Sequence, residues 1–580
     1  MFQTKTIEFL DEAQSEGLDR EFRAILARVS KGMSPVDLAL ATIDWATHLA
    51  ISPGKQVQLL QSFFNKLADL GVYGVESLVN KDAVTPVTAI ERRMSGEAWQ
   101  KWPFKLFAQA HQTGRDLLEQ ATIGIEGVKT EHEIIVHAAA EQILEKLSPA
   151  NFPLTNPEVL EATVKERGKN LARGLRFAVE DQFRRVTNKE ATPDTGFKVG
   201  ENVAVTPGKV VFQNDLVELI QYQPATEKVG AEPVLISPAW IMKYYILDLS
   251  PHNSLVKYLT EQGKTVFIIS WKNPEKEDQT VSFEDYIKIG LMEAINAVSA
   301  ICPKRKIHAV GYCIGGTLLS ITAAAMARDN DDRLASISLF AAQTDFSEAG
   351  EVSRYISHSQ LSFLEKVMWK RGYLTSEQMG GTFSSLRASD LVYASMVDRY
   401  LLGKEMSWND LMSWNADGTR MPHLMHSQYL QQLYLENRLA TNRFHVDGRL
   451  VSMADVRVPL YLLGTETDHV APWHSVYKLH YLTPSELTFV LTSGGHNAGV
   501  VSGPQHPRRR YRAHTRMPGD KFMDPDTWFS SMEVQAGSWW PHWSQWLDQR
   551  MSEQVDPPAM GAPKQGYKPL RDAPGEYVLG

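Results

Sequence analysis

KIHAVGYCIGGTLL, residues 306–319, is the stretch that decides the fold. Its apolar beginning predicts a buried strand, and the Ala-rich run that continues to Ala327 predicts a helix. Glycines stand on both sides of Cys313, where a tight turn between strand and helix needs residues without a side chain. The segment therefore predicts a strand, a sharp turn that exposes one cysteine, and a helix that begins directly after it.

The pattern G-x-C-x-G across this turn is typical of a nucleophile elbow, with cysteine at the reactive position. A helix N-terminus favours the thiolate, which is the nucleophilic form of cysteine. The alternative interpretation is a buried structural cysteine, since free cysteines are among the most buried residues. Cys302, the other cysteine of the chain, precedes a proline and has no motif around it, so we interpret it as structural.

Composition narrows the functional class. The chain has 580 residues, a net charge of −8 and two cysteines, which excludes a disulfide framework and favours a reducing, cytoplasmic compartment. The sequence has no signal-peptide pattern, no long apolar span, no zinc-ligand spacing and no phosphate-binding loop. We therefore expect no metal, no cofactor, no transmembrane segment and no nucleic-acid partner. The basic run 508–512 is either a solvated loop or a contact for an anionic substrate.

Residues 1–195 are predicted to form a mainly helical N-terminal domain. Apolar residues recur at helical spacing over 38–49 and 132–147, and a long helix is expected from about Pro157 to Arg185 with Asn156 as its cap. This region offers no acid–base constellation. Packing and contacts with partners are the simplest interpretation of it.

Residues 196–580 are predicted to form an α/β catalytic domain. A hairpin over 209–222 comes first, and near-continuous apolar strands then alternate with helices, which indicates a largely parallel sheet covered on both faces. About 346–455 separates the fourth strand from the fifth; this is too long for a loop and predicts a helical cap or lid. The predicted strands are 233–236, 265–269, 307–310, 335–340, 458–463 and 487–491.

A cysteine nucleophile needs a base and a group that orients the base. Asp468 follows the fifth strand, and His496 follows the sixth in a glycine-rich loop. Loops after parallel strands share one edge of a sheet, and the order nucleophile, acid, histidine is that of α/β-hydrolases. Glu466 is a rival for the acid and His469 for the base. We rank His496 higher and interpret His469 as a substrate-facing or supporting residue.

The tetrahedral intermediate of such a reaction needs backbone N–H donors for its oxyanion. The amide of Ile314, directly after the nucleophile, is the first candidate. The second is expected from the loop after strand 233–236. Pro238 has no N–H, which leaves Ala239 or Trp240, and the sequence does not choose between them.

With these residues in place, the chain resembles a polyhydroxyalkanoate synthase of the single-subunit class I type, from about Trp99 to the C-terminus. One departure is Met242, since the family usually has asparagine at this position, and it bears on the fit of the acyl chain. The resemblance rests on the stretches SPANF (148–152), TNPE (155–158), TPG (206–208), KYYILDL (243–249), SWKNP (270–274), GYCIGG (311–316), LLGK (401–404), WNAD (414–417), DH (468–469), GH (495–496) and GSWWPHW (537–543).

The resemblance implies an α/β-hydrolase fold and polymerisation of a (3R)-3-hydroxyacyl-coenzyme A, with 3-hydroxybutyryl-coenzyme A the first choice. Cys313 would carry the acyl group as a thioester, His496 would act as its base, and a growing polyester would be the product. Coenzyme A would enter with the substrate and would not be a cofactor. The resemblance also implies a homodimer, and a location at the surface of polymer granules, where other granule proteins are possible partners.

Two other readings remain open. A Cys-dependent thioesterase or hydrolase on the same fold would admit water to the acyl-enzyme. A catalytically idle scaffold on polymer granules would use the helical region alone. The complete set of Cys313, Asp468 and His496 argues against the scaffold.

Overall fold

The computed structural model describes residues 17, 22, 34–80, 91–186, 195–386 and 392–580. They form two compact units. Unit 1 comprises Met1–Pro193 and Gly381–Ser407, and unit 2 comprises Asp194–Gly380 and Trp408–Gly580. The sequence predicts one cap over about 346–455, but Gly381–Ser407, in the middle of this segment, belongs to unit 1. No helix among the described residues is long and apolar enough to cross a membrane.

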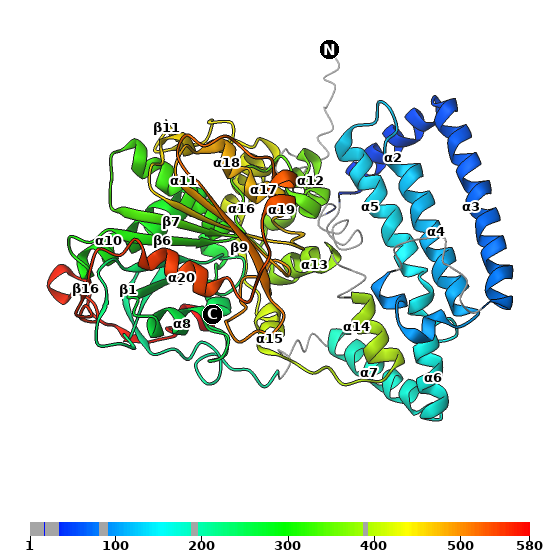
Figure 1. The fold of residues 1–580 in the computed structure, drawn as a ribbon, viewed down its shortest axis with the longest axis horizontal. Helices are drawn as coiled ribbons and strands as arrows, with labels where there is room; N and C mark the ends of the chain where they lie inside the picture. Colours follow the sequence, from blue (N-terminus) through cyan, green and yellow to red (C-terminus); the bar gives the residue numbers. More distant parts are fainter. Residues whose placement is uncertain (1–16, 18–21, 23–33, 81–90, 187–194, 387–391) are drawn as a thin grey trace, which may run out of the picture. The chain divides into compact units, whose positions relative to one another are not determined.

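Unit 2 is built on an eleven-stranded sheet with the order β15-β14-β13-β12-β7-β6-β4-β5-β2-β1-β17. Its centre is parallel from β13 to β5, as expected from strands that are apolar on both faces. All six predicted strands are present (Figure 1). They are β4 (Val234–Ser237), β5 (Val266–Trp271), β6 (Ile307–Tyr312), β7 (Leu334–Phe340), β12 (Leu460–Thr465) and β13 (Leu487–Thr492).

Both edges of the sheet are antiparallel. The predicted hairpin is β1 (Gly208–Gln213) with β2 (Val217–Tyr222), and β17 (Arg571–Asp572) adds to it. On the opposite side, β14 (Arg510–Arg516) pairs with β13, and β15 (Gln535–Ala536) adds beyond it. The interpretation of 508–512 as a solvated loop is therefore wrong from Arg510 onward. Pairing with β13 satisfies the backbone of β14, and its charged side chains remain partly exposed.

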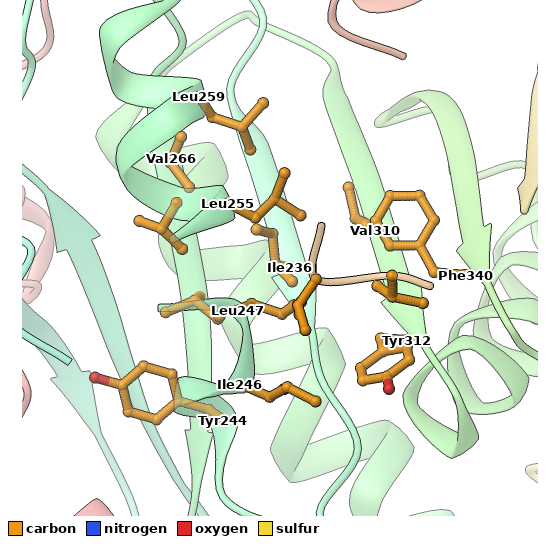
Figure 2. Close-up of a cluster of buried hydrophobic side chains, with 14 of the residues drawn as sticks. Ile236, Tyr244, Ile246, Leu247, Leu255, Leu259, Val266, Val310, Tyr312 and Phe340 are labelled. Carbon is orange, nitrogen blue, oxygen red and sulfur yellow. The ribbon is translucent and has the colours of Figure 1, made fainter. Parts of the chain in front are cut away.

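Helices cover both faces of the sheet. Helix α8 (Leu255–Glu261) and α20 (Trp540–Asp548) contribute Leu255, Leu259 and Trp543 to a buried cluster on one face, together with Val310 of β6. Figure 2 shows Leu255 and Leu259 packed toward the sheet residues of this cluster. Helices α10 (Glu293–Ile301) and α11 (Ile314–Arg328) lie on the other face (Figure 1). Helices on both faces hold the central strands in place, and the candidate site follows the carboxyl ends of these strands.

The expected cap segment is mostly helical. In unit 2 it contains α12 (His358–Met368), α15 (Asp410–Ala416) and α16 (His423–Tyr429). Its role as a lid stays a prediction. The remaining short elements of unit 2 are α9 (Phe283–Asp285), α17 (Trp473–Tyr477), α18 (Leu479–Leu482), α19 (Pro525–Ser531), β3 (Val229–Gly230), β8 (Tyr373–Leu374), β9 (Met421–Pro422), β10 (His445–Val446), β11 (Arg449–Leu450) and β16 (Gln554–Val555), while α13 (Ser376–Leu386) crosses the boundary between the units.

Unit 1 is helical, as predicted. The continuous helix expected from Pro157 to Arg185 is wrong, because Arg167 and Gly168 adopt φ values of 52° and 79° and end the first helix. Asn156 is the cap that the sequence predicts, and its side chain accepts from the N–H groups of Glu158 and Val159. The helices are α2 (Pro35–Ala50), α3 (Pro53–Val79), α4 (Phe104–Thr122), α5 (Thr130–Lys146), α6 (Pro157–Lys165), α7 (Lys169–Val186) and α14 (Ala394–Met396).

Candidate active site

Cys313 stands alone between β6 and α11. Its φ of 54° lies in the region that favours glycine, and for another residue this conformation costs about 1 to 3 kcal/mol. The surrounding backbone holds it there: its N–H donates to Phe340 O at 2.9 Å, and its carbonyl accepts from the N–H groups of Gly316 at 2.9 Å and Thr317 at 3.2 Å. This is the strained turn between strand and helix that the sequence predicts.

The glycines of the turn are required by close approach of backbone. A Cβ at Gly315 would lie 2.3 Å from Ser237 O and 2.6 Å from Pro238 O, and a Cβ at Gly311 would lie 2.4 Å from Gly316 Cα. The loop after β4 therefore lies against the first turn of α11. This is the loop from which the second oxyanion donor is expected.

We expect Gly315→Ala to lower the free energy of unfolding by about 2 to 3 kcal/mol, because backbone atoms of Ser237 and Pro238 must move to admit the methyl group. Urea unfolding followed by far-UV circular dichroism measures the change. Gly380→Ala is the matched control, since nothing lies within 4 Å of its Cβ position and alanine is the better helix former. Equal stability of Gly315→Ala and the unsubstituted chain would contradict the tight packing of the turn.

The structure brings Asp468 and His496 together. His496 Nδ1 lies 2.8 Å from Asp468 Oδ2, and the exposed fractions of the two side chains are 10% and 0%. Thr465 Oγ1 donates to the same oxygen at 2.9 Å, and the N–H groups of Val470 and Ala471 donate to Oδ1 at 2.9 and 2.8 Å. A carboxylate only accepts, so Nδ1 carries the proton and Nε2 is the nitrogen available to a nucleophile.

The electrostatics couple His496 to both partners. Burial alone would lower the pKa of His496, but the charges of Asp468 and Cys313 and hydrogen bonds to both raise it well above its ordinary value. Burial alone would raise the pKa of Asp468. The interactions with His496, the Ala471 N–H and the Thr465 hydroxyl outweigh burial and hold this pKa below its ordinary value. The arrangement therefore stabilises a carboxylate beside a protonated imidazole that has accepted a proton.

The rival assignments are placed elsewhere. Glu466 forms ion pairs with Arg510 at 2.7 Å and Arg512 at 3.1 Å, both on the antiparallel strand β14. His469 is half-buried beside Asp468. Cys302 is buried at the end of α10, and burial raises its pKa to about 12, which fits its interpretation as structural.

The roles of the expected oxyanion and substrate residues stay predictions. Ile314 begins α11, whose first N–H groups have no partner within the helix. Trp240 is buried with its ring 4.4 Å from that of Tyr286, and Ala239 is half-buried. Met242 forms an isolated backbone bridge with Gly418 and packs against the buried cluster of Figure 2.

Sequence reasoning missed the residues that hold the His496 loop. Tyr312 donates its hydroxyl to Asn497 Oδ1 at 2.6 Å, and its ring stacks on that of His496 with centroids 5.6 Å apart. Arg509 donates to the carbonyls of Ser493 at 3.0 Å and Ala498 at 2.7 Å, at the two ends of the loop. Arg509 belongs to the basic run, so part of that run supports the site from within the chain.

We expect Thr465→Val to lower kcat about tenfold and the free energy of unfolding by about 1.5 kcal/mol, because Asp468 loses one of its charge-assisted hydrogen bonds. The pKa of Asp468 is depressed in the folded chain, so its stabilisation is present at neutral pH and lost as the pH falls through that folded pKa. The variant should lose it at a higher pH. Urea unfolding between pH 3 and 7 measures the free energy of unfolding of the variant and of the unsubstituted chain, with Thr467→Val at an exposed position as control. If Thr465→Val and the unsubstituted chain lost stability over the same pH range, Thr465 would not be a partner of Asp468.

Three family models match parts of the chain. They are the poly-beta-hydroxybutyrate polymerase (PhaC) N-terminus over residues 90–259, the poly-beta-hydroxybutyrate polymerase N terminal over residues 13–55, and the alpha/beta hydrolase fold over residues 232–502. The last of these agrees with the parallel sheet and the turn at Cys313, and the predicted fold class is confirmed.

Three curated relatives cover most of the chain. Poly(3-hydroxyalkanoate) polymerase subunit PhaC of Rhizobium meliloti is 38% identical over 90% of this chain and 85% of its own length. Poly(3-hydroxyalkanoate) polymerase of Methylorubrum extorquens is 37% identical over 90% and 86%, and subunit PhaC of Cupriavidus necator is 35% identical over 84% and 83%. The chain therefore belongs to the poly(3-hydroxyalkanoate) polymerase family, a family of acyltransferases on the α/β-hydrolase fold.

Proposed function

We propose that this chain polymerises (3R)-3-hydroxyacyl-coenzyme A into a polyester with release of coenzyme A, and that 3-hydroxybutyryl-coenzyme A is its substrate. The observation that carries the proposal is the hydrogen bond between His496 and Asp468. The charge of Cys313, at the turn into α11, also contributes to the raised pKa of His496. The names of the relatives support the reaction class. The choice of acyl chain rests on the resemblance alone.

In the first half-reaction, Cys313 Sγ attacks the thioester carbonyl carbon and His496 Nε2 takes the thiol proton. The carbonyl oxygen becomes an oxyanion, for which the N–H of Ile314 and that of Ala239 or Trp240 are the proposed donors. The carbon–sulfur bond to coenzyme A then breaks, and His496 returns the proton to the leaving sulfur. The acyl group remains on Cys313 as a thioester.

In the second half-reaction, the 3-hydroxyl of another acyl unit attacks the thioester on Cys313. A base, His496 or Asp468, takes the hydroxyl proton as the ester bond forms, and the bond to Sγ breaks and restores the thiol. Exchange of one thioester for another is nearly thermoneutral, and the acyl-cysteine stays reactive toward an alcohol. Water must be kept from this intermediate, because hydrolysis would end the polymer.

A Cys-dependent hydrolase or thioesterase of the same fold is the alternative. It would use the same three side chains in the first half-reaction and would admit water to the acyl-enzyme in the second. The two functions therefore differ in their product and share the step that releases coenzyme A.

The product assay separates these functions. Purified protein with 3-hydroxybutyryl-coenzyme A is expected to release free thiol and to become turbid with an insoluble ester, in proportion to each other. Mass spectrometry of the soluble fraction measures any free 3-hydroxybutyrate. Free 3-hydroxybutyrate as the only acyl product would favour the hydrolase, and the absence of thiol release with both short and longer acyl chains would contradict both enzymes.

Further proposals concern the surroundings of the enzyme. We propose a cytoplasmic homodimer at the surface of polymer granules, without a cofactor in the reaction itself and with the helical residues of the cap segment acting as a lid. Sedimentation velocity with and without substrate tests the dimer. A monomer under both conditions would contradict it.

A further inference from the structure

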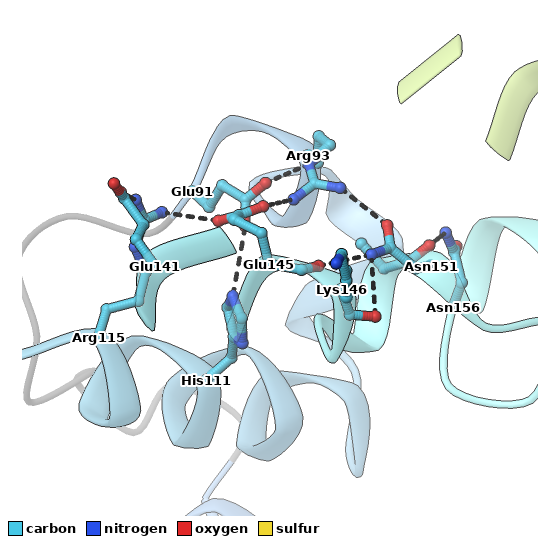
Figure 3. A network of polar contacts seen from close by, with 10 residues as sticks. Glu91, Arg93, His111, Arg115, Glu141, Glu145, Lys146, Asn151 and Asn156 are labelled. Carbon is cyan, nitrogen blue, oxygen red and sulfur yellow. Dashed lines mark hydrogen bonds and ion pairs between the residues drawn. The ribbon is translucent and has the colours of Figure 1, made fainter. Parts of the chain in front are cut away.

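Unit 1 contains a buried cluster of three side chains that the proposed reaction does not use. Glu91 lies just before the helical turn Arg92–Met94, His111 lies on α4 and Glu145 on α5. One ligand-type atom from each residue lies within 4.8 Å of the other two. Figure 3 shows Glu91 and His111 pointing toward Glu145 from different elements.

Each of these atoms is buried and lacks a hydrogen-bond partner. The exposed fractions of the side chains are 8% for Glu91, 3% for His111 and 8% for Glu145. Glu91 Oε2, His111 Nε2 and Glu145 Oε1 make no hydrogen bond within the described chain. Glu145 Oε1 has an ion pair with Arg115, whereas Glu91 Oε2 and His111 Nε2 have no hydrogen bond among the described residues. Buried polar atoms in folded proteins are almost always satisfied, so these two atoms indicate that a ligand belongs between them.

The neighbouring arginines orient the two carboxylates. Arg93 donates to Glu91 Oε1 and, at 2.6 Å, to Glu145 Oε2. The other oxygen of Glu91 then lies 3.8 Å from His111 Nε2, and the ligand atom of Glu145 lies within 4.8 Å of both. Arg115 Nη1 forms an ion pair with Glu145 Oε1 at 3.4 Å, and its Nη2 donates to Glu141 at 2.9 Å. Such partners hold metal-binding carboxylates in position. With three carboxylates against two guanidinium groups, the cluster has no excess of positive charge.

Two carboxylates share this buried space with His111. Burial, with Arg115 and Arg93, lowers the pKa of His111 to about 4. Burial, with the neighbouring charge of Glu91, raises the pKa of Glu145. A divalent cation would relieve the repulsion between the two carboxylates, which the arginines offset only in part.

We propose that Glu91, His111 and Glu145 form a binding site for a zinc ion in the helical unit. A nitrogen and two oxygen ligands suit Zn²⁺, which binds them at about 2.0 to 2.2 Å. Ligand atoms around tetrahedral zinc are then roughly 3.4 Å apart, and His111 Nε2 lies 3.8 Å from Glu91 Oε2. Shifts of under about 1 Å would close the site, and water would take the fourth position.

The site would link α4, α5 and the segment before the turn Arg92–Met94. The proposed role of the ion is structural, because it would tie these three segments of unit 1 together. The expectation of no metal, drawn from short-range spacing, did not test it, because its ligands come from distant parts of the sequence. The competing interpretation is an ion-pair network around Arg93 without a metal.

Binding of Zn²⁺ to the full-length chain tests the proposal. The chain carries Cys313→Ala, so that the catalytic thiol cannot bind zinc, has no histidine tag and is stripped with chelator. Competition with a zinc-binding dye is expected to show one site per chain. His111→Gln and Glu91→Gln should each weaken it at least about tenfold, a loss typical even of second-layer changes at metal sites.

Glu141→Gln is the matched control, because Glu141 belongs to the same network through Arg115 and offers no ligand to the centre. Its zinc affinity should stay within about threefold of the background. Zn²⁺ should also raise the thermal midpoint of the background and of Glu141→Gln, and leave that of His111→Gln unchanged. Circular dichroism without metal checks the fold of each variant.

Several outcomes would overturn the site. They are absence of zinc binding in the background chain, binding that survives both His111→Gln and Glu91→Gln, and an equal loss in Glu141→Gln. If one ligand variant fails to fold, the other decides. The visible spectrum of bound Co²⁺ is an independent readout: bands typical of tetrahedral nitrogen and oxygen ligands support the site, and an octahedral aquo spectrum contradicts it.

Discussion

Cys313→Ala is expected to lower kcat/KM for coenzyme A release by at least about 10⁴-fold, which is the scale of loss when a covalent nucleophile is removed from a triad. Without Sγ, no acyl-enzyme forms, and neither His496 nor the oxyanion donors can replace the missing bond. Thiol release from 3-hydroxybutyryl-coenzyme A, followed with a disulfide dye, measures the loss. Turbidity should disappear with it.

Cys302→Ala is the matched control, because Cys302 is the only other cysteine of the chain and is buried at the end of α10. Its kcat should stay within about twofold, even where the lost sulfur lowers stability. Substantial polymer formation by Cys313→Ala, with a native circular dichroism spectrum, would show that the nucleophile is another residue. An equal loss in both variants would point to misfolding.

Asp468→Asn is expected to lower kcat by about 10³- to 10⁴-fold with little change in the fold. Asparagine is nearly isosteric, but its amide cannot hold Nδ1–H of His496 as the carboxylate does at 2.8 Å, so the wrong tautomer of imidazole is favoured. The change also removes a charge that raises the pKa of His496. The residual rate should therefore increase with pH, because hydroxide must remove the proton that imidazole no longer accepts.

Glu466→Gln separates this effect from a general loss of charge near the site. Glu466 lies two residues before Asp468 and forms ion pairs with Arg510 and Arg512. Its kcat should fall by no more than about threefold, since the two ion pairs of Glu466 are with arginines of β14 and not with His496. Rates measured from pH 6 to 9 for both variants decide the matter. A larger loss of kcat in Glu466→Gln than in Asp468→Asn would mean that Glu466, and not Asp468, is the acid that orients His496.

Local signals explain why the catalytic unit could be predicted. Strands such as β6 and β12 are short apolar runs, and the glycines around Cys313 identify the turn directly. Once the strands are placed, the residues that follow them, Asp468 and His496, must lie at one edge of the sheet. The structure places these two side chains in hydrogen-bond contact.

Other features depend on tertiary contacts that no local pattern carries. The strand β14 contains three arginines and is typical of a solvated loop in sequence, but it pairs with β13 in the structure. Gly168 ends the first of the two helices between Pro157 and Arg185. A glycine is a common helix terminator, but the apolar periodicity continues past it and predicts one long helix. The grouping of Gly381–Ser407 with the helical unit and the assembly of Glu91, His111 and Glu145 follow from packing alone.

The account rests on a covalent acyl-cysteine, and trapping it is the most direct test. The protein is mixed with 3-hydroxybutyryl-coenzyme A at low molar ratio, quenched in acid within a second, digested with protease and mapped by mass spectrometry. The account predicts that the peptide containing Cys313 gains the mass of one or more 3-hydroxybutyryl units, and that hydroxylamine removes them. Acylation of a different residue, or coenzyme A release without any acyl-peptide, would contradict it.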